Sequence, residues 1–151
     1  MTLIIEPADP RTDGPRALLE ASHDLMRTNF PPEDNYFLDI DDLCEPDVYF
    51  FAARIGDTTL GTGALAAKDD YGEVKSMFTA DGARGKGVAA ALLRQIEDQA
   101  RALNLPVLRL ETAELLSAAM RLYERHGFTR CDIFGDYRPN ETSVFMEKPL
   151  T

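Results

Sequence analysis

The chain has 151 residues, of which 44% are hydrophobic and 28% charged, as is usual for a globular protein, and we expect one domain over residues 1–151. Its net charge of −10 argues against nucleic-acid binding, and either attracts a cationic amine or only maintains solubility. No apolar run approaches the roughly 20 residues that span a bilayer, and residues 1–6 do not resemble a secretory signal. We therefore expect a cytoplasmic protein without a membrane partner.

The cysteines and histidines give no pattern of metal ligands. Cys44 and Cys131 lie far apart and lack CxxC spacing, and His23 and His126 are isolated. We expect free thiols and no metal site.

The first third of the chain predicts one strand followed by helices. Residues 3–6 are typical of a strand. Apolar positions recur at helical spacing across residues 14–28, where Pro15 suits the first turn. After two prolines, residues 38–43 predict a short second helix.

The middle of the chain predicts a hairpin, a strand and a long helix. Residues 48–54 and 58–67 form hairpin strands around the turn Gly56-Asp57. Residues 73–79 predict the next strand, and residues 86–103 predict the longest helix.

The last third predicts a strand over residues 107–112 and a helix over 116–126, with Gly127 after its end. Residues 128–134 and 143–148 predict two closing strands. This order of elements indicates an α/β fold, in which one mixed sheet carries helices on both faces.

The segment from Arg84 to Ala89, between a predicted strand and a predicted helix, is the most informative. Gly85 and Gly87 remove side chains that would keep a ligand away from the backbone. The first N–H groups of a helix have no internal partner and carry partial positive charge, which suits phosphate. Arg84 and Lys86 add full charges, so we interpret the segment as a pyrophosphate-binding loop. The alternative is a plain connection, because the Walker A pattern is absent and the dinucleotide-binding pattern fits poorly.

Several motifs in this order resemble the GNAT superfamily of N-acetyltransferases, in particular its bacterial YsnE-like members. They are Arg84-x-x-Gly87-x-Ala89, the strands 73–79 and 108–112, Ala119-x-x-Leu122-Tyr123-x-x-x-Gly127-Phe128, and the closing strand 143–148. The resemblance implies a mixed, mostly antiparallel sheet of about seven strands with helices on both faces. It also implies that the fourth and fifth strands are parallel and splay apart, which admits the pantetheine arm of coenzyme A.

The resemblance implies acetyl-CoA as the cofactor and a set of residues that bind it. The set comprises Met77, Phe78, Thr79, Arg84, Gly85, Lys86, Gly87, Val88, Ala89 and Ser117. Relatives often carry Asn or Gln where this chain has Leu116. We expect Ser117 or Glu114 to replace that polar group, or the affinity for the cofactor to be weaker.

Two residues are candidates for catalysis. Tyr123 shares a helix face with Ala119 and Leu122, and its resemblance to the family tyrosine implies a general acid for the departing sulfur. The alternative is a core tyrosine whose hydroxyl is bonded to the protein. Glu73 is the candidate base, although it could instead pair with a lysine, and Glu111 or a chain of waters could take the proton.

We therefore expect direct acetyl transfer from acetyl-CoA to the primary amine of a small molecule, by an enzyme that could form a homodimer. Residues 28–43 and 135–141 are expected to supply the acceptor pocket, with candidates Tyr36, Phe37, Asp39, Asp41, Asp42, Asp136, Tyr137 and Arg138. Two alternatives stay open: a non-catalytic acyl-CoA-binding regulatory domain, which Leu116 favours and Tyr123 opposes, and an N-acetyltransferase of proteins or peptides.

Overall fold

The computed structural model describes residues 2–150 and is built on one seven-stranded sheet in the order β1-β2-β3-β4-β5-β7-β6. The strands are β1 (Leu3–Pro7), β2 (Val48–Ile55), β3 (Thr58–Ala67), β4 (Gly72–Thr79), β5 (Val107–Ala113), β6 (Thr129–Arg130) and β7 (Ser143–Pro149). Among these neighbours β4 and β5 run parallel, and the other pairs are antiparallel. The expected α/β class and mostly antiparallel sheet are confirmed.

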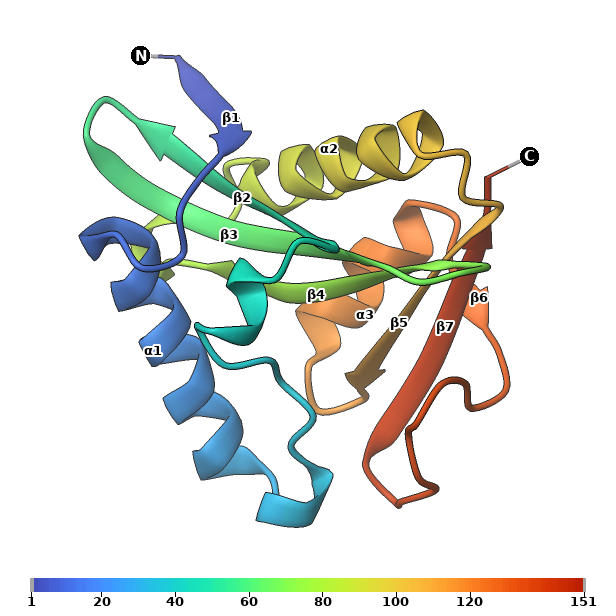
Figure 1. Cartoon of the computed structure of the whole chain (residues 1–151). Helices are drawn as coiled ribbons and strands as arrows, with labels where there is room; N and C mark the ends of the chain where they lie inside the picture. Colours follow the sequence, from blue (N-terminus) through green and yellow to red (C-terminus); the bar gives the residue numbers. More distant parts are fainter. Residues whose placement is uncertain (1, 151) are drawn as a thin grey trace.

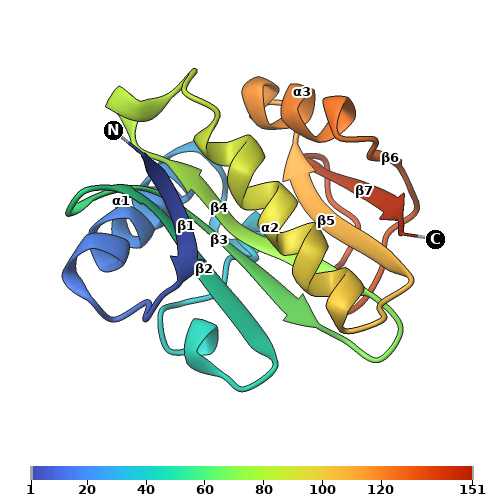
Figure 2. The ribbon, with the colours of Figure 1, turned by 90° about the horizontal axis from the view of Figure 1, so that it is seen from above.

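Helices cover both faces of the sheet (Figures 1 and 2). They are α1 (Asp13–Asn29), α2 (Val88–Ala102) and α3 (Ser117–Arg125), with short 3-10 helices η1 (Pro32–Asp34), η2 (Asp42–Cys44) and η3 (Asp81–Ala83). α1 lies on one face, and α2 and α3 lie on the other. The longest helix is α1, with 17 residues against 15 in α2, so that expectation for residues 86–103 was wrong. No helix within residues 2–150 combines the length and apolar character that crossing a membrane requires.

The alternation of side chains along β2 divides the core between the two faces. Phe51 is 2% exposed and packs in the cluster that α2 and α3 supply, whereas Phe50 packs with Leu19 of α1. Burying one large apolar side chain contributes roughly 1.5–3 kcal/mol, so these contacts hold both helix layers firmly on the sheet.

The short helix expected over residues 38–43 is wrong, and only the 3-10 turn η2 forms nearby. A single capped turn forms here and is not continued. The Asp39 carboxylate accepts from the N–H of Asp42 at 2.9 Å, and the Asp42 carboxylate accepts from the N–H of Asp39 at 3.2 Å. These reciprocal bonds have the pattern of a capping box, which favours a turn at this point. The turn ends because Glu45, directly before Pro46, is extended.

The strand expected over residues 128–134 is also too long, because β6 contains only Thr129 and Arg130. After the N–H of Cys131 donates to the carbonyl of Phe145 at 2.9 Å, the chain leaves the sheet. Phe134, 8% exposed, then turns inward and packs edge-on against Tyr71 and Phe145. Aromatic contacts, rather than strand pairing, therefore hold the segment that precedes β7.

The parallel pair of strands splays apart, as expected. β4 and β5 pair only at Gly72 with Leu108 and at Glu73 with Arg109, and beyond these positions the two strands diverge (Figure 1). The edge of β4 that faces β5 therefore has no strand partner from Val74 onward.

Candidate active site

A pocket lies where β4 and β5 separate, and we call it the cleft pocket. Four elements and the segment after α1 supply its wall, together with one residue that precedes β7. The lining residues are Ser22, His23, Met26, Phe30, Asp34, Asn35, Tyr36, Phe37, Val74, Lys75, Ser76, Met77, Glu111, Thr112, Ala113, Leu116, Ala119, Tyr123 and Thr142. The cavity volume is about 120 Å³, which is room for a small group.

A bulge in β4 shapes one wall of this pocket. The pairing of β3 with β4 shifts between Thr62 and Ala64, and Ser76 adopts a left-handed φ of 56°. The Thr62 hydroxyl donates to the carbonyl of Ser76 at 2.8 Å and holds this conformation. Bulges re-aim the backbone, and this one lies in the part of β4 that β5 leaves unpaired. Main-chain groups near Met77 are thus available to a ligand between the strands.

The loop from Arg84 to Ala89 forms an open cradle at the start of α2. Gly85 and Gly87 have φ of +79° and +77°, and an added Cβ at either would meet no atom within 4 Å. Gly87 is the N-cap of α2 and provides no side-chain cap, and the first turn holds no acidic residue. Unpartnered N–H groups with partial positive charge therefore face open space, which fits the diphosphate of a nucleotide.

The side chains of this loop differ in whether a ligand can reach them. Arg84 and Lys86 are exposed, and Arg84 forms a 3.4 Å ion pair with Asp81. Val88 is 2% exposed, and its side chain packs so close to Gly61 that a Cβ there would lie 2.6 Å from Val88 Cγ1. Only the main chain of Val88 is therefore available to a ligand.

Tyr123 reaches the cleft pocket from α3, and the end of that helix fixes its place. The N–H of Phe128 donates to the carbonyl of Tyr123 at 3.0 Å, the N–H of Gly127 donates to that of Glu124 at 3.1 Å, and Gly127 has a φ of 91°. This is a Schellman cap, and it places the Phe128 ring edge-on against Tyr123 at 5.7 Å. The expected role of Gly127 after the helix is confirmed.

The surroundings of Tyr123 keep its hydroxyl protonated. The residue is 6% exposed, and burial raises the pKa of its phenol. The negative charge of the nearby Glu111 carboxylate raises this pKa further. A phenol with a raised pKa remains a hydrogen-bond donor at neutral pH, as proton donation to a leaving group requires.

Glu73, the expected base, is engaged with other side chains. It is 5% exposed, does not line the cleft pocket, and forms a 3.3 Å ion pair with Lys75. Its carboxylate also accepts a hydrogen bond from the hydroxyl of Tyr137. Burial, followed by the charge of Glu73, raises the pKa of Tyr137, so that hydroxyl stays a donor.

Glu111, the rival base, lines the cleft pocket directly from β5. Its Oε2 accepts from the Ser143 hydroxyl at 2.7 Å. Burial raises the pKa of its carboxyl above the ordinary glutamate value, although the Ser143 bond and Lys75 oppose the shift. A carboxylate with a raised pKa is a better proton acceptor near neutral pH.

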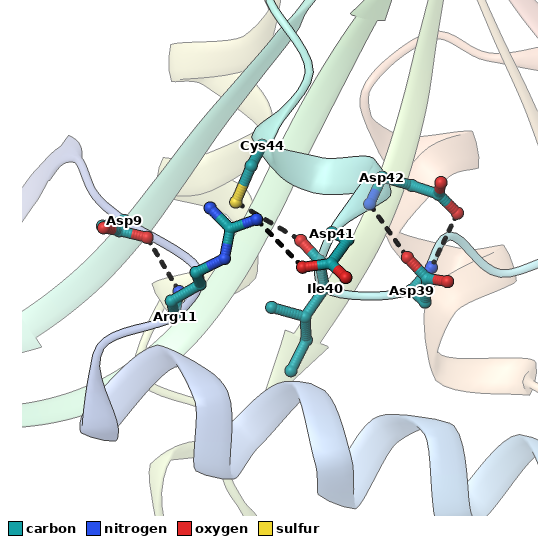
Figure 3. A network of polar contacts seen from close by, with 7 residues as sticks. All are labelled: Asp9, Arg11, Asp39, Ile40, Asp41, Asp42 and Cys44. Atoms are coloured by element: carbon teal, nitrogen blue, oxygen red, sulfur yellow. Dashed lines mark hydrogen bonds and ion pairs between the residues drawn. The ribbon is translucent and has the colours of Figure 1, made fainter.

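Several acidic residues expected at the acceptor pocket lie elsewhere. Asp39 and Asp42 bond each other's backbone, and Asp41 pairs with Arg11 at 2.9 Å (Figure 3). None of the three lines the cleft pocket, and neither Asp136 nor Arg138 does. Tyr36 and Phe37 do line it, as expected, whereas Tyr137 lies behind the wall, where it contacts Lys75 and the ring of Tyr36.

Asp34 lies in the segment 28–43 that was expected to supply the pocket, but it was not among the named candidates, and the contribution of α1 to the pocket wall was missed. Asp34 follows two prolines in no recognisable motif, and its Oδ2 accepts from the Thr142 hydroxyl at 2.9 Å. His23 lies on the buried face of α1, beside Leu19 and Ser22, and stacks on Phe37 with ring centroids 4.2 Å apart. The apolar spacing over residues 14–28 predicted a helix, but it did not mark the polar residues Ser22 and His23 as part of its buried face.

Leu116 lines the cleft pocket as the N-cap of α3, where it gives no side-chain cap. Of the two residues considered as its replacement, Ser117 is exposed and lies outside the pocket wall. The other, Glu114, pairs with Arg130 at 2.7 Å. The pocket wall at this position is therefore apolar.

Comparison with known proteins agrees with this geometry. Residues 16–128 match the model of the Acetyltransferase (GNAT) family. The chain is 41% identical over 143 residues to an IAA acetyltransferase of Azospirillum brasilense, covering 93% of this chain and 94% of that protein. It is 40% identical over 123 residues to the uncharacterized N-acetyltransferase YsnE of Bacillus subtilis, covering 80% and 82%.

Solved structures show the same fold. A Klebsiella pneumoniae protein assigned as an acyl-CoA N-acyltransferase superposes with a TM-score of 0.82 at 30% identity, covering 99% of this chain and 98% of that one. A GNAT family acetyltransferase of Elizabethkingia anophelis, solved with acetyl-CoA bound, has a TM-score of 0.68 at 16% identity and covers 97% of each chain.

Proposed function

The chain belongs to the GNAT family of acetyltransferases and is an acyl-CoA-dependent N-acetyltransferase, and on this premise we propose that its acceptor is the primary amine of a small molecule. The observation that carries the proposal is the cleft pocket, whose wall brings Tyr123 and Glu111 together beside the unpaired edge of β4. We further propose that residues 1–151 act as one domain in this reaction.

The family uses acetyl-CoA, which supplies an acetyl thioester as the group donor. We assign its diphosphate to the main-chain N–H groups from Gly85 to Ala89, with Arg84 and Lys86 adding charge at the rim. The unpaired edge of β4, from Met77 through Phe78 to Thr79, is assigned to the amide groups of the pantetheine arm and the thioester oxygen. One such donor to a developing oxyanion typically lowers a barrier by about 3–4 kcal/mol. Ser117 remains an assigned contact at the start of α3.

Two proton transfers fall to residues of the cleft pocket. The acceptor arrives as an ammonium ion, and Glu111 takes one proton so that nitrogen has a lone pair for the carbonyl carbon. As the C–N bond forms and the C–S bond breaks, Tyr123 gives its proton to sulfur, and the second proton of the nitrogen replaces it. The geometry favours Glu111 over Glu73 as the base, because Glu73 is bound to Lys75 and Tyr137 and does not line the pocket.

The size and lining of the pocket support a small acceptor. The cavity of about 120 Å³ is lined by aromatic rings, including Phe30 and Phe37, and its wall contains the Asp34–Thr142 hydrogen bond. Such a pocket suits a compact amine with an apolar body, since aromatic walls bury apolar area and also attract cations.

The test measures the release of the coenzyme A thiol from acetyl-CoA in the presence of different acceptors. The acceptors are small primary amines, peptides, and IAA, which is included because it appears in the names of relatives. We expect turnover with small primary amines, and we expect the Tyr123→Phe variant to bind acetyl-CoA normally but to turn over slowly. Turnover confined to peptides would overturn the small-molecule proposal in favour of a peptide acetyltransferase.

A further inference from the structure

The acidic and basic groups in the wall of the cleft pocket are equal in number but differ in their availability to a ligand. Two carboxylates, Asp34 and Glu111, face two groups that could carry positive charge, Lys75 and His23. Whether the pocket accepts an anionic group on the substrate depends on whether either of the latter is available.

Lys75 is fully engaged by the protein. Its ammonium donates to the carbonyl of Tyr36 at 3.1 Å, to the hydroxyl of Tyr137 at 2.8 Å and to the carboxylate of Glu73 at 3.3 Å. An ammonium has three donors, so these partners exhaust it. Its charge is also matched by that of Glu73, and the side chains of both are nearly buried, at 11% and 7% exposed.

His23 adds no positive charge at neutral pH. Burial lowers the pKa of its imidazole, and the neighbouring Arg27 lowers it further. Arg27 itself lies outside the pocket wall, with its guanidinium 5.3 Å from the centre of the Phe37 ring and 3.4 Å from Asp24.

The two carboxylates lack a cation of their own in the part of the chain that the structure describes. Asp34 accepts from the Thr142 hydroxyl, and Glu111 accepts from the Ser143 hydroxyl, both of which are neutral donors. The charges of Lys75 and Glu73 act on Glu111 in opposite directions. The pocket wall therefore presents negative charge to whatever binds there.

We propose that the acceptor is a primary amine with no carboxylate on the carbon that bears the nitrogen, and that Asp34 is a residue that enforces this choice. The inference rests on the proposed function. An α-carboxylate would enter the pocket beside the reacting nitrogen, where it would find no available cation and would face Asp34 and Glu111. Repulsion between like charges in a partly desolvated site weakens binding by about tenfold to a hundredfold.

Matched compounds separate charge from size. Each set contains an amino acid, its amide and the amine left by removal of the carboxylate, for example tyrosine, tyrosinamide and tyramine, arginine, argininamide and agmatine, and leucine, leucinamide and 3-methylbutylamine. The amide keeps the bulk of the amino acid and removes its negative charge. We expect kcat/KM for the amide and the amine to exceed that for the amino acid by about tenfold or more in at least one set at low salt.

Two variants connect this preference to Asp34. Asp34→Asn keeps the shape of the side chain, and we expect it to reduce the ratio of kcat/KM for the amide to kcat/KM for the amino acid severalfold. Asp136→Asn is the matched control, because Asp136 is exposed and lies outside the pocket wall, and it should leave this ratio unchanged. The wild-type comparison decides the preference even if Asp34→Asn fails to fold.

The outcomes distinguish this inference from the function on which it rests. If kcat/KM for the amino acids equals that for their amides and amines in every set, the inference fails and small-amine acetylation stands. If Asp34→Asn leaves the ratio of amide to amino acid as large as in the wild type, Asp34 loses its role. If no member of any set is acetylated although acetyl-CoA binds, the small-amine proposal fails, and this inference fails with it.

Discussion

Replacement of Gly87 tests the cofactor cradle most sharply, because it separates contacts with the ligand from contacts within the protein. The residue has a φ of +77°, and an added Cβ would meet no atom within 4 Å. Asn and Asp tolerate left-handed conformations better than most residues, so Gly87→Asn and Gly87→Asp should fold at a cost of about 1 kcal/mol. For a chain of this length, that cost lowers the melting temperature by about 2–4 °C.

The magnitude of the binding defect follows from charge rather than strain. Since the backbone is strained equally in the free and bound protein, strain cancels from the dissociation constant. A carboxylate about 5 Å from one phosphate charge, at an effective dielectric constant near ~20, repels it by about 3 kcal/mol. That energy weakens binding about a hundredfold. Gly87→Asn carries a similar shape without the charge, so it should bind more tightly than Gly87→Asp.

Calorimetric titration with acetyl-CoA at two salt concentrations measures the effect. We expect the gap between Gly87→Asp and Gly87→Asn to shrink at high salt, because the loop is exposed and its charges are screened. Gly82→Asp is the control, since a Cβ at Gly82 also meets nothing within 4 Å and no positive φ constrains that residue. Equal affinity of the wild type and both Gly87 variants would refute the assignment of the cradle.

Four substitutions test the pocket and its support. Tyr123→Phe should lower kcat by about 10²-fold with unchanged affinity for acetyl-CoA, and an unchanged kcat would reduce Tyr123 to packing. Because a base must be ionised, wild-type kcat/KM should rise as the pH increases through the raised pKa of Glu111. The Glu111→Gln variant should lose this rise of kcat/KM with pH, and the Glu73→Gln variant should keep it. A raised pKa in the folded state means that this group stabilises the fold at low pH and loses that contribution as pH rises, so Glu111→Gln should melt above the wild type at pH 8 and not at pH 4. Gly61→Ala should cost about 1–3 kcal/mol in a denaturant titration, because its Cβ would lie 2.6 Å from Val88 Cγ1.

The sequence predicted those parts of the fold in which a local pattern and tertiary packing agree. Residues 58–67 were expected as a strand, and β3 has these bounds, because its small and apolar side chains are buried between α1 and α2. The expectation failed where side chains override local preference. Asp39 and Asp42 cap only a single turn, which ends where Glu45 becomes extended, and Phe134 leaves the sheet for an aromatic cluster. Both events depend on partners that residue periodicity does not encode.

The candidate site divides in the same way. The loop from Arg84 to Ala89 is contiguous and its glycines mark it in the sequence, so it could be proposed from sequence alone; in the structure it lies at the start of α2. The acceptor side of the cleft pocket is assembled from α1, β4, β5 and α3, and Asp34 enters it without any motif. No spacing rule connects a residue after α1 to Thr142, although their side chains form a 2.9 Å hydrogen bond.

The choice between the two candidate bases shows what a single structural fact adds. Both Glu73 and Glu111 lie on neighbouring strands, and sequence gave no reason to separate them beyond the resemblance. The pairing of β4 with β5 ends at Glu73 and Arg109, so Glu73 lies where the strands are still joined and its side chain is enclosed by Lys75 and Tyr137. Glu111 lies two residues beyond that point, where the strands have parted and a side chain meets the pocket instead of a neighbouring strand. Since only a group that reaches the acceptor nitrogen can take its proton, the position at which pairing stops favours Glu111.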